Sequence, residues 1–260
     1  MKYDGDDVRL SATDLVGHLN CRHLTEQDRA VARGSLPEPK VWDPALEALW
    51  ERGKQHEASY VDHLTDQGLE IVTIDGVDIT PEAVAETTAA MQAGKAIILQ
   101  GALRTGAWAG RTDVLRRIET PSALGDWSYE VEDTKLARET KGSTVLQISL
   151  YSDLLADVQG RSPELMHVVA PYTDFTPETF RTADFAAYYR VVRRSLEAAV
   201  ANPADGQTYP EPNPFCEICR WRDICDQRRR ADDHLSLVAG ISKNQMVELV
   251  ERAINTTAAL

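Results

Sequence analysis

The sequence has no long hydrophobic run, no internal repeat and no low-complexity tract. No stretch of its 260 residues approaches the ~20 consecutive apolar residues that a helix needs to cross a bilayer. The first residues, MKYDGDDVRL, are acidic and polar, so they do not resemble a secretory signal. With 43% hydrophobic residues, the chain can build one large domain, alone or with an attachment. These features predict a soluble cytoplasmic protein without a membrane partner.

The chain also lacks a surplus of basic residues. It has 28 Lys and Arg against 41 Asp and Glu, which gives a formal net charge of −13. Because nucleic acids are polyanions, this balance argues against binding them through overall charge. It does not exclude a local basic groove, so a nucleic-acid site would have to draw its positive charge from particular residues.

Cysteines are few, but three of the four are closely spaced. Cys216, Cys219 and Cys225 form the pattern C-x2-C-x5-C, whereas Cys21 lies almost the whole chain away. In a reducing compartment this spacing favours metal ligation over disulfides. Four thiolates suit either Zn²⁺ or an iron–sulfur cluster, and thiol chemistry alone leaves both open. Three histidines are alternative ligands: His18, His23 and His234.

Hydrophobic periodicity, together with Pro and Gly at the starts and ends of segments, predicts alternating helices and strands. We expect helices ending near Cys21, over Pro44–Gly68, over Pro81–Gly94, from about Ser143, and over Phe185–Val200. We expect strands over Glu70–Ile74, Ala96–Leu99, Trp108–Ile118, around Asp133, and over Met166–Val169. The second and third of these helices begin at a proline, which is favourable in a first helical turn. Helices flanking a central mixed sheet make an α/β or α+β core.

The segment VEDTKLA carries a possible chemical site. On a strand, Asp133 and Lys135 share one face because side chains alternate with a period of two. The strand before it contains Asp113, and the two strands are expected to pair as a hairpin. Two carboxylates on neighbouring strands can converge on one hard cation, which prefers oxygen ligands. The alternative interpretation is an ordinary surface ion pair on an edge strand.

Two further helices supply candidate partners for these carboxylates. Gln147 and Tyr151 are four residues apart and therefore lie on one helix face. His56, in the segment RGKQHE, is a third candidate metal ligand, although the adjacent Glu57 competes with it for that role. Each of these signals also fits an ordinary helix face.

In this order, His56, Asp113, Asp133-x-Lys135 and Gln147-x3-Tyr151 resemble the RecB-like branch of the PD-(D/E)xK nuclease superfamily. In that branch one cysteine before the nuclease core and three after it hold a 4Fe–4S cluster, as in AddB-type and CRISPR-adaptation nucleases. The cysteines here have the same layout: Cys21, then Cys216, Cys219 and Cys225. The resemblance implies a restriction-endonuclease-like core whose N- and C-terminal segments are joined by the cluster.

The resemblance also implies a reaction, metal-dependent hydrolysis of DNA phosphodiester bonds. Mg²⁺ or Mn²⁺ would be held by Asp113 and Asp133, with His56 and the carbonyl group of Thr134. Lys135 would orient the attacking water or stabilise the developing charge, and Gln147 and Tyr151 would position the substrate strand. DNA contacts are expected from three basic residues: Arg116, Arg138 and Lys141.

By the same resemblance, residues 1–230 form the nuclease domain, and residues 231–260 form a helical extension or the start of a linker. The expected activity is an exonuclease acting on single-stranded DNA or DNA ends, in repair, recombination or defence, with a helicase as a possible partner. The principal alternative is a catalytically silent module that binds DNA ends in a helicase–nuclease assembly. A simple zinc protein with surface carboxylates is a second alternative.

Overall fold

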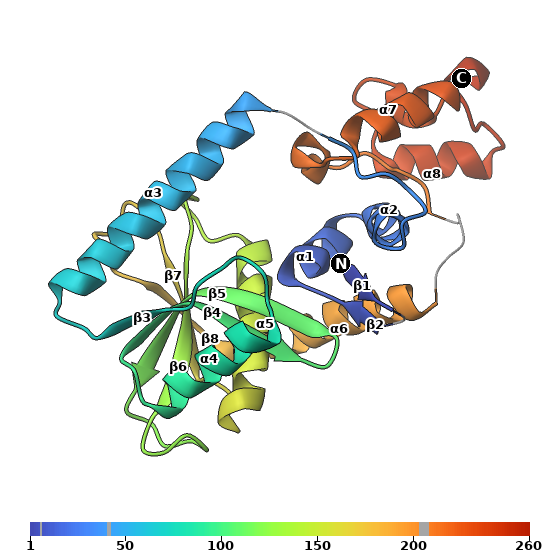
Figure 1. Ribbon diagram of the computed structural model, residues 1–260. Helices are drawn as coiled ribbons and strands as arrows, with labels where there is room; N and C mark the ends of the chain where they lie inside the picture. Colours follow the sequence, from blue (N-terminus) through green and yellow to red (C-terminus); the bar gives the residue numbers. More distant parts are fainter. Residues whose placement is uncertain (6, 41–42, 203–207) are drawn as a thin grey trace. The chain divides into compact units, whose positions relative to one another are not determined.

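The computed structural model describes residues 1–5, 7–40, 43–202 and 208–260, which form two compact units (Figure 1). Unit 1 comprises Met1–Val16 and Asp43–Ala198, and unit 2 comprises Gly17–Trp42 and Ala199–Leu260. Unit 2 is therefore assembled from two segments that lie far apart in the sequence. The expected division into residues 1–230 and 231–260 stays a prediction about domain organisation.

A mixed sheet of six strands forms the centre of unit 1, in the order β3-β4-β5-β6-β7-β8. The pairs β3–β4 and β6–β7 are parallel, and the other neighbours are antiparallel. Its strands are β3 (Ile71–Thr73), β4 (Ile97–Thr105), β5 (Trp108–Ile118), β6 (Ser128–Thr134), β7 (Leu165–Val169) and β8 (Glu178–Arg181). A separate two-stranded sheet pairs β1 (Lys2–Asp4) with β2 (Asp7–Arg9). The expected mixed α/β sheet is confirmed.

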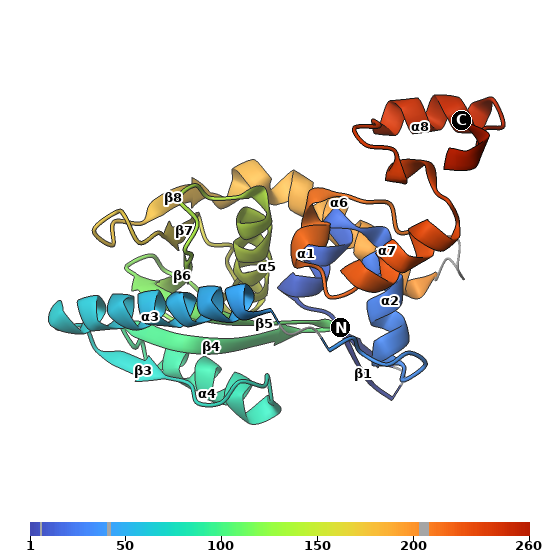
Figure 2. The ribbon, with the colours of Figure 1, turned by 90° about the horizontal axis from the view of Figure 1, so that it is seen from above.

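Helices α3, α4 and α5 pack around the sheet of unit 1 (Figure 2). Five helices begin in the described part of unit 1: α1 (Ala12–Asn20), α3 (Pro44–Asp66), α4 (Pro81–Gln92), α5 (Gly142–Gln159) and α6 (Thr182–Ala201). Their starts follow from the sequence: Asp43 caps α3 and Thr80 caps α4, each directly before a proline. Helix α5 is buried over most of its surface, as expected for an apolar helix packed on more than one side.

The secondary-structure elements assigned within the described part of unit 2 are all helices. Its elements are α2 (Arg22–Ala32), η1 (Pro214–Ile218), α7 (Arg222–Ala231), η2 (Leu235–Leu237), α8 (Lys243–Glu251) and η3 (Thr257–Ala259). Helix α8 lies within the helical extension expected after residue 230. In the described part of the chain, no helix combines the length and the apolar character needed to cross a membrane.

The two faces of β6 meet different helices. The side chain of Glu132 accepts a hydrogen bond from Tyr60 of α3, at 2.7 Å. The next residue, Asp133, accepts one from Gln147 of α5, at 3.3 Å. Because consecutive side chains of a strand point to opposite faces, α3 and α5 cover opposite faces of the sheet at this strand.

The structure corrects two expectations about the strands. Residues Ser128–Asp133 are all buried because β6 lies between β5 and β7, so the edge-strand interpretation is wrong. The strand expected over Ala96–Leu99 continues to Thr105 as β4, because it forms a long hairpin with β5. Strand β8, which was not expected, pairs with β7 at the end of the sheet.

An apolar core lies between α3 and the sheet. Leu64 has no exposed surface there, and the cluster consists of Tyr60, Leu64, Ile97, Leu99, Val114 and Val169. This core fixes α3 against β4, β5 and β7, and so fixes the part of α3 that carries His56 and Glu57.

We expect Leu64→Ala to lower the free energy of unfolding by about 2–5 kcal/mol, because it removes a fully buried side chain and leaves a cavity. Leu49→Ala is the matched control on the same helix, since the side chain of Leu49 is 48% exposed. Urea denaturation of both variants measures the difference. Equal losses would show that α3 does not pack on the sheet as described.

Candidate active site

The hairpin of β5 and β6 brings two of the expected carboxylates together. Its register pairs Val114 with Glu132, and therefore places Asp113 opposite Asp133. One oxygen of Asp113, Oδ2, accepts hydrogen bonds from the backbone N–H and the hydroxyl of Thr134, both at 2.8 Å. These bonds orient the Asp113 carboxylate at the end of β6.

Asp133 is fully buried and lies beside a single ammonium group. Its Oδ2 is 2.5 Å from Nζ of Lys135, and its Oδ1 accepts from Gln147. Burial, reinforced by the negative charge of Asp113, raises the pKa of Asp133 to about 7, although Lys135 opposes the shift. A buried carboxylate in this setting gains from an additional cation, because ionising it is otherwise costly.

A third carboxylate, Glu57 of α3, belongs to the same electrostatic neighbourhood. Burial and then the charge of Asp113 raise the pKa of Glu57, whereas a hydrogen bond from Gln100 and the charge of Lys135 lower it. Glu57 also contributes to the raised pKa of Asp133. Three carboxylates thus share the charge of one lysine, a surplus of negative charge that suits a divalent cation.

Gln100 was not among the residues singled out from the sequence. It lies in β4 between the residues paired with Val114 and Thr112, and therefore opposite Asp113. Its φ of 54° is unusual for a residue other than glycine, and its side chain donates to Glu57. Its carbonyl accepts from Arg111 at 2.6 Å. Such backbone conformations are common at functional sites, but nothing in the sequence marks this one.

Gln147 and Tyr151 lie together on α5, as their spacing indicates. Gln147 Nε2 donates both to Asp133 and to the Tyr151 hydroxyl, the latter at 3.2 Å. Burial and the charge of Asp133 raise the pKa of Tyr151 above its ordinary value, so the phenol stays neutral. Its ring packs on Gly110, where an added Cβ would lie 2.5 Å from the ring. This close approach requires glycine on β5.

His56 is buried on α3, next to Glu57. Its Nε2 lies 3.0 Å from the carbonyl oxygen of Val169, and its ring stacks on Phe175 at a centroid distance of 6.0 Å. Of the two neighbouring residues, Glu57 is the one that interacts electrostatically with both aspartates. The role of His56 as a metal ligand stays a prediction.

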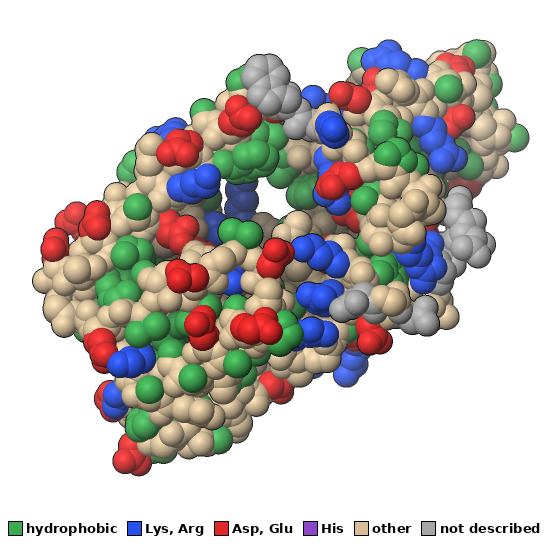
Figure 3. Space-filling model, in the orientation of Figure 1, with side chains coloured by type: hydrophobic (Ala, Val, Ile, Leu, Met, Phe, Trp, Pro, Cys, Tyr) green, Lys and Arg blue, Asp and Glu red, His purple; other side chains and the backbone are tan. Residues whose placement is uncertain are grey.

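The three basic residues expected to contact DNA have different surroundings. Arg116 forms an ion pair with Glu132 and donates to Tyr60 at 3.2 Å, so its charge is largely neutralised. Arg138 and Lys141 are exposed and follow β6. Acidic and basic side chains are interspersed over the face drawn in Figure 3. Of the three residues expected to contact DNA, Arg138 and Lys141 therefore keep an exposed charge.

The four cysteines all belong to unit 2. They line one pocket together with Trp221 and Arg229, and none forms a disulfide. Burial and the charges of the other three cysteines raise the pKa of Cys225 to about 11, although Arg229 opposes the shift. Within the residues that the structure describes, no three His, Cys, Asp or Glu side chains are arranged closely enough to hold a metal ion.

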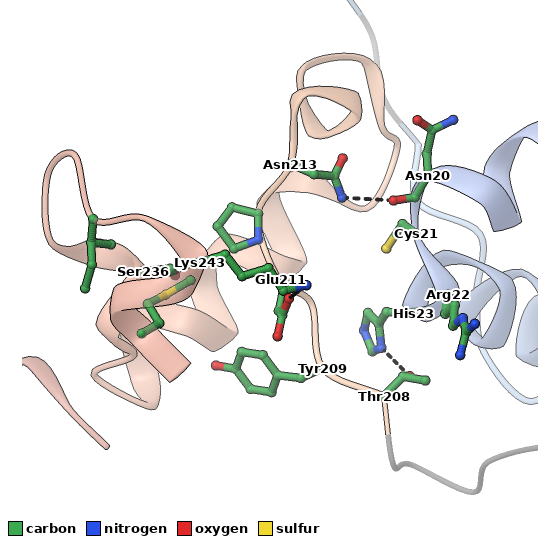
Figure 4. Close-up of a pocket in the computed structure, with 13 residues that line it drawn as sticks. Asn20, Cys21, Arg22, His23, Thr208, Tyr209, Glu211, Asn213, Ser236 and Lys243 are labelled. Carbon is green, nitrogen blue, oxygen red and sulfur yellow. Dashed lines mark hydrogen bonds and ion pairs between the residues drawn. The ribbon is translucent and has the colours of Figure 1, made fainter. Parts of the chain in front are cut away.

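Polar contacts join the two segments of unit 2 around Cys21. Asn213 Nδ2 donates to the carbonyl oxygen of Asn20 at 3.3 Å, and His23 Nδ1 lies 2.9 Å from the Thr208 hydroxyl (Figure 4). The indole N–H of Trp221 donates to Asp28 at 2.8 Å. These contacts hold the N-terminal segment with Cys21 beside the C-terminal segment with the other three cysteines.

Comparison with known proteins identifies the type of domain. Residues 17–226 match the family model described as "PD-(D/E)XK nuclease superfamily". Among solved structures, the one described as "Crystal structure of SSO0001" is 14% identical, with a TM-score of 0.40, and the match covers 86% of this chain and 88% of that chain. That similarity is too weak to support an inference. A comparison with curated proteins finds no match.

We expect Asp133→Asn to raise the free energy of unfolding at pH 8, measured in a chelator, by roughly 1–4 kcal/mol. In the unfolded wild-type chain the Asp133 carboxyl ionises above its ordinary pKa of about 3.9. In the folded protein the same carboxyl stays protonated until about pH 7. The free energy of unfolding of the wild type therefore decreases as the pH rises through this window. The difference between the variant and the wild type shrinks as the pH falls towards 4. Urea titrations at several pH values measure this difference. A constant difference would contradict the buried, raised-pKa carboxyl.

Proposed function

The chain belongs to the PD-(D/E)XK nuclease superfamily, and on this basis we propose that it hydrolyses DNA phosphodiester bonds with the help of Mg²⁺ or Mn²⁺. The observation that supports this most strongly is the placement of Asp113 opposite Asp133 with Lys135 paired to the latter. A pure binding module has no need of two carboxylates held side by side at the cost of burial.

The donor set fits a divalent cation. Asp113 and Asp133 offer carboxylate oxygens, the ligands preferred by Mg²⁺ and Mn²⁺, and Glu57 is a third carboxylate that interacts electrostatically with both. Apart from its ion pair with Lys135, Oδ2 of Asp133 has no hydrogen-bond partner among the described residues. The remaining ligands are proposed to be the carbonyl oxygen of Thr134 and either Glu57 or His56. Of these two, Glu57 is favoured, because His56 Nε2 already interacts with Val169.

The proposed reaction assigns a task to the bound ion and to each remaining residue of the site. A bound divalent ion neutralises charge on the phosphate and lowers the pKa of a coordinated water. Lys135 would exchange its contact with Asp133 for one with the attacking water or the scissile phosphate, where it stabilises negative charge. Gln147 holds Asp133 Oδ1 in place. Together with Tyr151, Gln147 would also position the substrate strand.

We further propose that the four cysteines hold a structural 4Fe–4S cluster. Support comes from the four thiols lining one pocket in a unit built from the two ends of the matched region. A cluster binds its four thiolates at different iron atoms, so it does not need them as close together as one zinc ion does. Free thiols and such a cluster both favour a reducing compartment, which agrees with a cytoplasmic location.

The finer assignments are proposals of the same kind. Exonuclease action on single-stranded DNA or DNA ends, a role in repair, recombination or defence, and cooperation with a helicase domain or protein follow from the resemblance of the motifs. A catalytically silent module that binds DNA ends is the competing function, and the experiment below distinguishes the two.

We expect Asp113→Asn to lower Mn²⁺-dependent cleavage of labelled DNA by at least about 100-fold, because it removes a carboxylate that holds the metal. Asp157→Asn, an exposed carboxylate on α5, is the matched control and should cleave like the wild type. DNA binding, measured by fluorescence anisotropy, should persist in both variants. Binding without cleavage in the wild type would favour the silent module, and full activity of Asp113→Asn would exclude the proposed centre.

We expect the protein purified without oxygen to be brown and to contain iron and sulfide. Single Cys→Ser changes at each of the four cysteines should each reduce the iron content and lower the melting temperature, because metal binding is coupled to folding. Elemental analysis and visible absorption measure this. A colourless protein with one zinc ion per chain would show that the cysteines hold zinc and not a cluster.

A further inference from the structure

The loop that follows β7 places an exposed tyrosine near the catalytic lysine. Val169, the last residue of β7, pairs with Thr134, and its carbonyl accepts from the backbone N–H of Lys135 at 3.1 Å. Tyr172 follows three residues later, so the chain keeps it within about 10 Å of Val169. The side chain of Tyr172 is 65% exposed, although large aromatic residues usually gain from burial.

The same loop is firmly anchored at its other end. Asp174 and Phe175 both adopt left-handed conformations, with φ of 51° and 59°, which are costly for residues other than glycine. The ring of Phe175 lies 4.9 Å from that of His63 and stacks on His56, both on α3. The loop is thus held against α3 by Phe175, while Tyr172 is left in solvent.

A guanidinium group accompanies the exposed ring. Arg138, which follows Lys135 by three residues, lies over the ring of Tyr172 at 5.6 Å from its centroid. The segment that carries Arg138 is tied to β8 by a hydrogen bond of 2.5 Å from Thr140 to Glu178. Because β6 and β7 run in parallel, the segments after both strands leave the sheet at the same end, beside the catalytic carboxylates.

We propose that Tyr172 and Arg138 form a binding site for one unpaired nucleotide next to the scissile bond. The Tyr172 ring stacks on the base, and Arg138 contacts a neighbouring phosphate. A planar aromatic ring needs the open face of a base, which a single strand presents and the interior of a duplex does not. The site therefore makes the enzyme select single-stranded DNA or a frayed end, and this selectivity rests on the proposed nuclease function.

The test measures binding rather than cleavage. In the Asp113→Asn background, in metal-free buffer, fluorescence anisotropy gives the affinity for a labelled oligothymidine and for an abasic strand of equal length. Tyr172→Ala should weaken binding of oligothymidine by about 5- to 150-fold, the range expected for losing one stacked base. Binding of the abasic strand should not change, because that strand keeps its phosphates but has no bases.

Three further variants complete the design. Tyr172→Phe should restore binding of oligothymidine, because it keeps the ring. Arg138→Gln should weaken binding of both strands and reduce the slope of log affinity against log salt by about one. Tyr188→Ala is the matched control, since Tyr188 is 50% exposed on α6 and should not affect either strand.

The outcomes separate the inference from the function on which it rests. Normal binding of oligothymidine by Tyr172→Ala, or equal losses on both strands, would overturn the stacking site and leave the nuclease proposal intact. Failure of the Asp113→Asn protein and the wild type to bind any DNA would overturn both. Unchanged melting temperatures in the Tyr172 variants would show that a loss of affinity does not arise from unfolding.

Discussion

The placement of two like charges on neighbouring strands, one of them fully buried, is the constraint around which unit 1 is arranged. The pairing of β5 with β6 places Asp113 opposite Asp133, and the latter has no exposed surface. Like charges in a poorly solvated position repel strongly unless a cation or a proton compensates them. Burial and then the charge of Asp113 raise the pKa of Asp133, and one lysine supplies only part of the compensation, so a divalent cation suits the site.

The surrounding structure serves to hold this unfavourable arrangement in place. The apolar contacts of α3 with the sheet and the ring of Tyr151 against Gly110 fix the two helices that carry Glu57 and Gln147. Thr134 donates a hydrogen bond to Asp113, and Gln147 donates one to Asp133, so neither carboxylate can rotate freely. Stability elsewhere in the sheet thus offsets the cost of the site, as is common for active sites.

The second unit solves a different problem, the joining of two distant chain segments. Polar contacts such as that between Trp221 and Asp28 connect its segments, and the side chain of Trp221 is itself buried. Four thiols lining one pocket provide a place where a bound cluster would add to these contacts. The cysteines are therefore expected to matter for the integrity of unit 2 rather than for chemistry at Asp113 and Asp133.

The sequence by itself determined the order of the main elements, the β5–β6 hairpin and most of the candidate site. Periodicity, proline and capping residues act within a few positions, so α3, α4 and β5 could be placed without a structure. The motif Asp133-x-Lys135 and the helical spacing of Gln147 and Tyr151 likewise made these four residues candidates. The tertiary structure decided what depends on distant neighbours. It makes β6 a central strand and brings Glu57 into the site of the two aspartates. It also pairs Arg116 with Glu132 and gives Gln100 a left-handed conformation. These properties arise from pairing and burial between residues far apart in the chain, for which a local pattern contains no signal.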